Sequence, residues 1–233
     1  MIAAIMQPTY LPWAGYFNLI NQVDIFFFLD DAQFAKQSWH NRNRILRNNK
    51  EVLITISLKK KKNETTINNC LVFDLKDWKK KHANIIYNCY FKHPFFSCIK
   101  EILDSYDKIL FDNLSEINIF FIKFICEKLL IKSNFVRTSE TGILGKRTER
   151  TIKILQKFNV KKYISPEGSK EYLTKDKFIE RTNIILIFNN FISKKYNQLN
   201  NDNFIANLSI LDVIANLGWK DTKIYINNGF NEK

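Results

Sequence analysis

The 233-residue sequence contains few of the residues that interrupt or cross-link a chain: 6 glycines, 4 prolines and 4 cysteines. With so little Gly and Pro, and with 45% hydrophobic and 14% aromatic residues, the chain is not a linker, a collagen-like fibre or a disordered tail. It is expected to form a packed core. The cysteines include no C-x-x-C pair, so a zinc ribbon or a thioredoxin-type site has no support. We expect them to be reduced, mostly buried thiols.

The sequence also lacks a long apolar run and a basic leader. No segment reaches the roughly 18 apolar residues that a membrane span requires. The start, MIAAIMQPTYLPW, lacks the positively charged region of a signal peptide. These features predict a soluble, cytoplasmic protein with no membrane span.

Positive charge is abundant, with 36 Lys+Arg against 23 Asp+Glu and a net charge of +13. Nucleic acid is one partner that such a charge suggests. The lysine runs are spread over the whole chain, however, and do not form a stripe interleaved with aromatic residues, so biased genome composition explains them as well. Arginine is the more selective phosphate ligand, and the arginines cluster at 42, 44 and 47 and at 147 and 150. We therefore expect a phosphate-bearing small ligand and not nucleic acid.

The first 30 residues predict a βαβ unit. IAAIMQP is an apolar run ended by proline, residues 10–23 have apolar side chains at helical spacing, and DIFFFLD (24–30) is a second apolar run. A crossover of this length implies two parallel strands. EVLITISL (51–58) alternates as a further strand, with residues 69–73 as a candidate hairpin partner.

The hydrophobic periodicity changes twice in the rest of the chain. Residues 75–131 have helical periodicity and predict three helices, separated at Pro94 and near 112–115. Strands are then expected at 134–138, 162–165 and 184–188, and helices at 148–158 and at 209–217, the last ending at Gly218. The predicted fold is a mostly parallel, Rossmann-like three-layer α/β sheet with an inserted or appended helical subdomain. We expect one α/β domain over residues 1–233, with the helical insertion at about 75–132.

Candidate functional residues follow the first two predicted strands, because ligands of open α/β sheets bind beyond the carboxyl ends of strands. The first strand is followed by Gln7, Tyr10 and Trp13. The second is followed by acidic and polar residues and then by a polar and cationic segment: Asp30, Asp31, Gln33, Lys36, His40, Arg42 and Asn43. The alternative interpretation is a helix cap, a surface charge and a solvated turn.

A second group lies in the C-terminal half. Lys146, Arg147 and Arg150 open a predicted helix, whose free backbone amides favour a phosphate. The turn SPEGSKEYL contains Ser165, Gly168 and Tyr172 and can present amides to a ligand. A solvated first turn and a capped helix start remain as alternatives for these two segments.

The segment Trp13-Ala14-Gly15-Tyr16 occupies the place of the HxGH helix start of nucleotidylyltransferases. Gly15 is present, but Trp and Tyr stand where that motif has its two histidines. Nucleotide transfer or ATP-dependent ligation on a shared scaffold is therefore kept as an alternative function, and a non-enzymatic nucleic-acid-binding module as another.

Four blocks of the sequence resemble the WbqC-like family of bacterial O-antigen and other surface-polysaccharide gene clusters: MQPTYLPWAGYFNLI, VDIFFFLDDAQFAKQSWHNRNRI, YISPEGSKEYL and LSILDVIANLG. The resemblance runs nearly end to end. It implies an enzyme of lipopolysaccharide O-antigen biosynthesis, with transfer of glycine to an amino sugar as the suggested activity. The family supplies no established catalytic residues.

Transfer of an acyl or aminoacyl group to a sugar amine requires a base, oxyanion donors and a site for the activated donor. Asp30, Asp31 or His40 are the candidate bases. Gln7, Asn43 and Arg42 are candidate oxyanion or phosphate ligands, and Tyr10 and Trp13 are candidate stacking residues. The expected partner is a nucleotide-linked amino sugar, and an acyl carrier protein is a candidate second partner. We expect no metal and no tightly bound cofactor, only a carrier-protein, CoA or nucleotide-linked acyl donor as co-substrate.

Overall fold

A computed structural model describes residues 1–60, 65–199 and 203–228. Five parallel strands form its main sheet, in the spatial order β5-β2-β1-β6-β7. These strands are β1 (Ile2–Met6), β2 (Ile25–Phe28), β5 (Asn134–Arg137), β6 (Lys162–Pro166) and β7 (Ile185–Asn189). Numbered in chain order within the sheet, they run 3-2-1-4-5, the order of a Rossmann-type sheet. The predicted parallel α/β class is confirmed.

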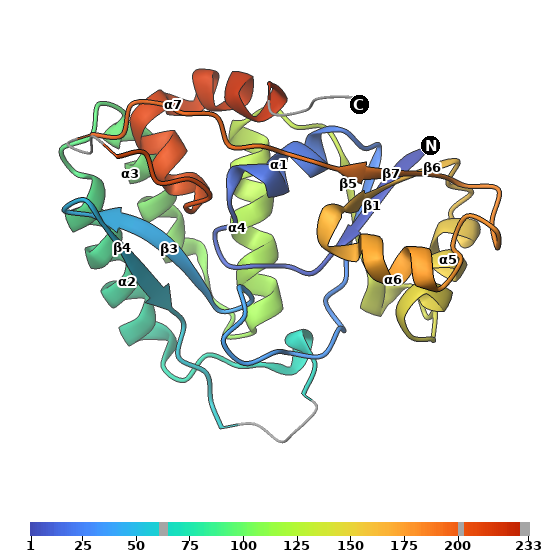
Figure 1. Ribbon diagram of the computed structural model, residues 1–233. Helices are drawn as coiled ribbons and strands as arrows, with labels where there is room; N and C mark the ends of the chain where they lie inside the picture. Colours follow the sequence, from blue (N-terminus) through green and yellow to red (C-terminus); the bar gives the residue numbers. More distant parts are fainter. Residues whose placement is uncertain (61–64, 200–202, 229–233) are drawn as a thin grey trace.

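Helices cover both faces of this sheet because successive strand residues point to opposite faces. Phe26 and Phe28 pack into the larger core with α1 (Ala14–Asn21) and α4 (Leu114–Lys128). Ile25 and Phe27 pack into the smaller core with α5 (Arg147–Lys157) and α6 (Lys170–Lys175). Figure 1 shows α5 and α6 on the side of the molecule away from α2 and α3.

Three helices lie in the region from residue 75 to residue 131, as the periodicity predicted: α2 (Leu75–Tyr90), α3 (Phe96–Ser105) and α4. Asp74 and Asn113 cap α2 and α4 by accepting hydrogen bonds from the backbone amides of Asp77 and Glu116. Tyr106, in the turn η2 (Tyr106–Lys108), also enters the larger core. The helical region therefore shares one core with one face of the sheet.

The strand predicted at residues 51–58 does not have residues 69–73 as its main hairpin partner. The strand β4 (Lys50–Thr55) pairs with β3 (Arg42–Arg47), and residues 69–73 contribute only isolated bridges, including Leu58 to Val72. The turn residues Asn48 and Asn49 have φ of +48° and +62°. Asparagine tolerates this left-handed region, which suits the tight turn between twisted strands. The polar residues of β3 concealed a strand in what was expected to be a loop.

Two helix boundaries also differ from the prediction. The first helix begins at Ala14 and not at residue 10, because the preceding segment contains Pro12 and a left-handed Leu11 at φ +43°. The last helix, α7 (Ile210–Asn227), continues beyond the predicted stop. Gly218 does interrupt it, with φ +69° and ψ 178°, but a second helical segment follows. Within the described residues, none of the helices has the length and apolar character needed to cross a membrane.

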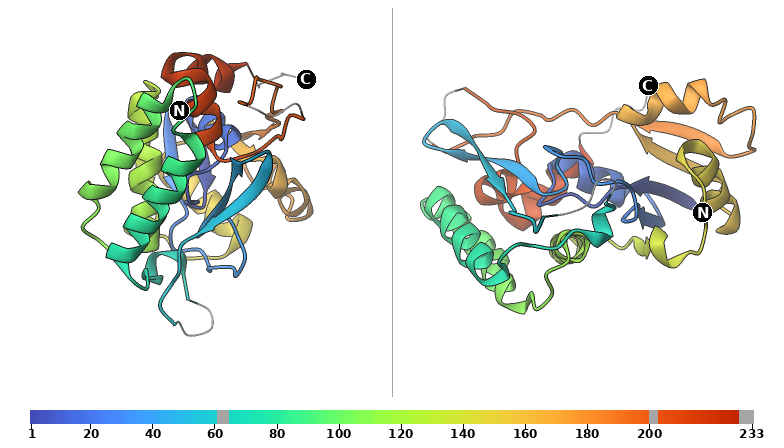
Figure 2. Two further views of the ribbon diagram at one scale, coloured as in Figure 1. Left: turned by 90° about the vertical axis from the view of Figure 1, so that its left-hand side faces the viewer. Right: turned by 90° about the horizontal axis from the view of Figure 1, so that it is seen from below.

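Figure 2 shows a long segment running between β7 and α7 along the same side of the molecule as α7. Its described residues are anchored to that helix: the Tyr196 hydroxyl and the Gln198 amide both donate to Asp212 Oδ2, at 2.6 and 2.9 Å. The two ends of this segment, Phe191 and Asn207, reach the carboxyl ends of the central strands. The tertiary fold thus brings residues from the C-terminal part of the chain to the loop after β1.

Candidate functional site

Two cavities lie beyond the carboxyl ends of β1 and β6 and share Met6, Trp13 and Tyr16 in their walls. These strands are the neighbours at which the strand order reverses, where open α/β sheets bind ligands. The hairpin cavity, of about 260 Å³, is also lined by Thr9, Pro12, Trp39, Asn43, Arg44 and Asn207. The switch-point cavity, of about 320 Å³, is also lined by residues that include Gly15, Glu167, Gly168, Asn189, Asn190 and Phe191.

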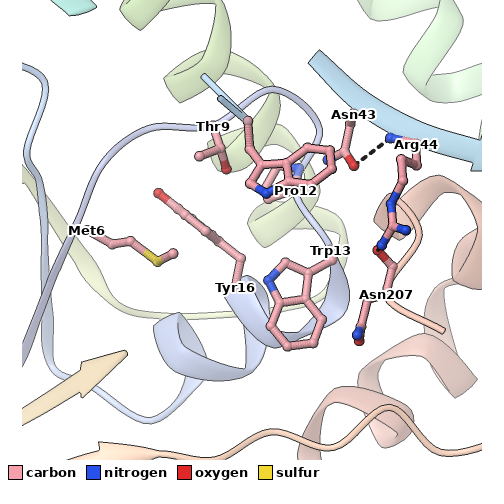
Figure 3. Close-up of a pocket in the computed structure, with 9 residues that line it drawn as sticks. Met6, Thr9, Pro12, Trp13, Tyr16, Asn43, Arg44 and Asn207 are labelled. Atoms are coloured by element: carbon pink, nitrogen blue, oxygen red, sulfur yellow. Dashed lines mark hydrogen bonds between the residues drawn. The ribbon is translucent and has the colours of Figure 1, made fainter. Parts of the chain in front are cut away.

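Trp13 forms the wall between the two cavities. Its indole lies over the first turn of α1, so that a Cβ added at Gly15 would be 2.4 Å from the ring. The ring of Phe191 packs edge-on against it, with centroids 5.4 Å apart. Figure 3 shows Arg44 and Asn207 on one side of Trp13, and Tyr16 and Met6 on the other. The glycine of the PWAG segment is therefore required for close packing of this tryptophan.

Asn43 holds the loop between β1 and α1 in place. Its Nδ2 donates to the carbonyls of Tyr10 and Leu11, at 2.9 and 2.8 Å, and its Oδ1 accepts from the Arg44 amide at 2.7 Å (Figure 3). The Ser209 hydroxyl donates a second hydrogen bond to the Leu11 carbonyl. These bonds stabilise a leucine in the left-handed region, a conformation that needs such support.

Tyr10 lies away from both cavities, in the larger core, with 0% exposure. Its hydroxyl is 2.9 Å from Nδ1 of His82 and 2.8 Å from the hydroxyl of Tyr106. Nε2 of His82 donates to the Thr55 carbonyl, because a carbonyl can only accept, and Nδ1 therefore accepts from Tyr10. Tyr10 joins the β1–α1 loop to the helical region, and its ring is enclosed by the larger core.

Gln7 and His40 form a pair beneath the same loop. Nε2 of His40 donates to Oε1 of Gln7 at 3.0 Å, and the Tyr16 hydroxyl donates to the Gln7 carbonyl. His40 is buried, and Asn118 of α4 donates to its carbonyl. Neither the Gln7 nor the His40 side chain lines the two cavities. The structure thus brings these two predicted residues together, one layer below the cavity walls.

The arginines of β3 surround Trp39 at the rim of the hairpin cavity. The guanidinium carbons of Arg42 and Arg44 lie 5.9 and 5.6 Å from its ring centroid. Arg44 lines the cavity and donates to both carboxylate oxygens of Glu51, at 3.1 and 3.0 Å, and to the Asn207 carbonyl. Arg42 donates to the Gln37 carbonyl. The predicted Gln33 and Lys36 are exposed and lie outside both cavities.

The two aspartates after β2 bind the neighbouring segments of the protein. Asp30 is buried and accepts from the amide and hydroxyl of Ser139. Asp31 accepts from Nη1 and Nη2 of Arg150, at 2.8 and 2.5 Å, and from the hydroxyl of Thr138. Burial acts to raise the pKa of Asp31, but the hydrogen bonds from Arg150 and Thr138 outweigh it and hold that pKa below its ordinary value. Asp31, a candidate base, and Arg150, a candidate phosphate ligand, thus neutralise each other.

The remaining predicted residues divide between the switch-point cavity and other positions. Gly168 lines the cavity, whereas Arg147 is exposed, at φ +48°. Ser165 is fully buried, and its hydroxyl bonds to those of Ser169 and Tyr163. Tyr172 is 38% exposed and does not line either cavity. Burial raises the pKa of its hydroxyl.

Several wall residues were not among the site residues selected from the sequence: Tyr16, Trp39, Arg44, Glu167, Phe191 and Asn207. Glu167 directly follows β6, so the strand-end rule would have selected it. Arg44 belongs to the arginine cluster noted in the sequence, and Trp39 to the same segment. Phe191 and Asn207 carry no such signal, because they lie in irregular segments. Among the described residues, no group of three or more His, Cys, Asp or Glu side chains is arranged to hold a metal ion.

Comparison with known proteins agrees with the sequence blocks. The family model described as "WbqC-like protein family" matches residues 7–224. A relative from Mycobacterium tuberculosis, named "Uncharacterized protein Rv1507c", is 31% identical over 217 residues, which cover 92% of this chain and 93% of the relative. No solved structure matches the chain. The residues matched include the β1–α1 loop, the β3 hairpin and the turn after β6, which together build the two cavities, and the chain belongs to the WbqC-like protein family.

Proposed function

We propose that this protein is a cytoplasmic transferase of surface-polysaccharide (O-antigen) biosynthesis that adds an acyl or aminoacyl group, such as glycyl, to the amine of a nucleotide-linked amino sugar. The observation that carries the proposal is the pair of adjoining cavities around Trp13 at the point where the strand order reverses. Family membership supports it. The four cysteines are free thiols, in keeping with a reducing compartment.

The two adjoining cavities, of about 260 and 320 Å³, suit such a ligand in size when taken together, and their walls suit it in chemistry. Small-molecule sites measure about 300–1,000 Å³ and combine apolar walls with a few polar groups. Trp13 and Trp39 offer flat faces to a nucleobase or sugar ring. Nε of Arg44 has no hydrogen-bond partner among the described residues, although it is buried. The guanidinium of Arg44 lines the hairpin cavity, and its terminal N–H groups are suitable donors to a diphosphate.

In the proposed reaction the sugar amine attacks the carbonyl carbon of the activated donor. A nitrogen–carbon bond forms, the bond to the donor's leaving group breaks, and the oxyanion formed in between needs hydrogen-bond donors. Asn43 faces the hairpin cavity, but its Nδ2 donates to two backbone carbonyls. We therefore assign Arg44 as the donor to the phosphate or oxyanion and Asn43 as the residue that positions the loop.

The test is to incubate the purified protein with nucleotide-linked amino sugars and with glycyl or acyl donors, and to measure product mass. We expect a mass gain equal to the transferred group, and at least a tenfold loss of rate for Trp13→Ala. Phe73→Ala is the matched control, because Phe73 is 69% exposed and lies outside both cavities. Both variants are checked by equilibrium unfolding. Absence of product across a broad panel would contradict the proposal, and pyrophosphate exchange with ATP or CTP would favour nucleotide transfer instead.

A further inference from the structure

The two cavities differ in charge. Among the residues that line them, the hairpin cavity has one charged side chain, Arg44, and the switch-point cavity has one, Glu167. Trp13 belongs to the walls of both cavities. Complementary charge at an interface fixes the orientation of the bound molecule. Arg44 also pairs with Glu51, but both side chains are partly exposed and such pairs contribute little. The two cavities therefore suit a ligand with an anionic part at one end and a cationic part at the other.

Glu167 is held at the carboxyl end of β6 by a short turn, η4 (Glu167–Ser169). Pro166 ends the strand with φ −58° and ψ 144°, and the Ser169 hydroxyl donates to the Pro166 carbonyl at 2.6 Å. One carboxylate oxygen, Oε1, accepts from Lys170 at 3.2 Å in a solvent-exposed pair. Exposed pairs of this kind contribute little, so Lys170 does not compete strongly with a bound cation.

The neighbouring wall is apolar or neutral. Phe191, Tyr16 and Trp13 supply rings, and Asn189 and Asn190 supply the amide groups of this cavity. A cation bound here is shielded on one side by the rings, which strengthens its attraction to a carboxylate relative to that in bulk water. The aromatic faces also attract a cationic group. Both effects favour an amine over a hydroxyl at the same position of a ligand.

We infer that Glu167 binds the ammonium group of a dipolar ligand whose phosphate contacts Arg44. This inference rests on the proposed function, within which it assigns the sugar amine to the switch-point cavity and the diphosphate to the hairpin cavity. During transfer, the Glu167 carboxylate accepts one proton from the ammonium and so frees the nitrogen lone pair. The amine then attacks the donor thioester or acyl phosphate. The nitrogen–carbon bond forms, the leaving group departs with the electron pair of the broken bond, and the second amine proton passes to it.

The test uses UDP-glucosamine and UDP-glucose, which differ only in the amine, with binding measured by calorimetry at pH 7. We expect the wild-type protein to bind the amino sugar about tenfold more tightly, the difference that a charge-assisted hydrogen bond supplies. Glu167→Gln is expected to abolish this preference and to leave the affinity for UDP-glucose unchanged. Glu171→Gln is the matched control, because Glu171 is exposed on α6 and lines neither cavity. Arg44→Gln is expected to weaken the binding of both ligands equally.

The outcomes separate the two proposals. Equal wild-type affinity for the two sugars, or an unchanged preference in Glu167→Gln, overturns the assignment of Glu167 and leaves the proposed function standing. A clear amine preference without any transferase product supports the assignment and contradicts the transfer reaction. Failure to bind either ligand overturns both. Unfolding curves for each variant establish that a lost preference does not come from a lost fold.

Discussion

The buried histidine of α2 makes the stability of this protein depend on pH. His82 is 3% exposed, donates through Nε2 to the Thr55 carbonyl and accepts at Nδ1 from the Tyr10 hydroxyl. Burial lowers the pKa of His82 from 6.5 to about 4; the bond to Thr55 acts to raise that pKa, and the nearby Lys81 lowers it further. The folded protein therefore keeps this imidazole neutral at pH values where the unfolded chain protonates it.

The sign and size of the effect follow from proton linkage. Between pH 6.5 and about 4 the unfolded state binds a proton at His82 that the folded state does not bind, so the free energy of unfolding falls as the pH falls. At about 1.4 kcal/mol per pH unit, the loss approaches 3 kcal/mol by pH 4. Above pH 6.5 both states are neutral at this residue and the contribution is constant.

The assay is denaturant unfolding of the wild-type protein and of His82→Gln at pH values from 7.5 to 4. The glutamine does not titrate, and the carboxylates of both proteins do, so the difference between the two curves isolates His82. We expect the wild-type protein to lose about 3 kcal/mol relative to the variant over this interval. Parallel curves would show that the His82–Tyr10–Tyr106 network does not exclude the proton, and would refute the reasoning.

Three further predictions concern the elements that build the site. Asp31→Asn breaks the pair with Arg150 and is expected to cost about 1.5–3 kcal/mol at pH 7. Because the folded pKa of Asp31 lies below its ordinary value, the cost should shrink as the pH falls below about 4 toward that folded pKa, and a constant cost measured by unfolding would contradict the ion pair. Gly15→Ala places a Cβ 2.4 Å from the Trp13 ring and is expected to cost about 1–3 kcal/mol and to shift Trp13 fluorescence, whereas Gly168→Ala, with no atom within 4 Å, should do neither. Gly218→Ala places an alanine at φ +69° with its Cβ against the Phe95 ring, and is expected to lower the melting temperature. A melting temperature equal to that of the wild-type protein would show that the break in α7 relaxes without cost.

Local patterns predicted most of the elements because their signals lie within a few residues. Helices α2, α3 and α4 follow from apolar spacing and from the breaks at Pro94 and near Asn113, and the strands follow from short apolar runs. The error at β3 has a local cause as well. Arg42, Asn43 and Arg44 look like a loop in sequence, but they begin a strand in which Asn43, Ile45 and Leu46 are buried.

The candidate site was predicted less completely. The strand-end rule selected the segments after β1, β2 and β6, and of the selected side chains Trp13, Asn43 and Gly168 line the two cavities. Nothing in the sequence showed that Asp31 pairs with Arg150, 119 residues later. These two charged residues are far apart in the chain, and they meet only because α5 packs against the sheet.

The sequence by itself determined the α/β class, the parallel βαβ start, the three-helix region and the family, because hydrophobic period and motif spacing are local properties. Only the tertiary structure decided which polar groups line a cavity. Tyr10, Asp30 and His40 are polar residues in the motif blocks, yet each is buried and hydrogen-bonded within the protein. Burying a polar side chain requires a partner, and that partner comes from a distant segment. The cavity walls likewise combine the loop after β1, the hairpin, the turn after β6 and both ends of the segment between β7 and α7, which meet only when the chain has folded.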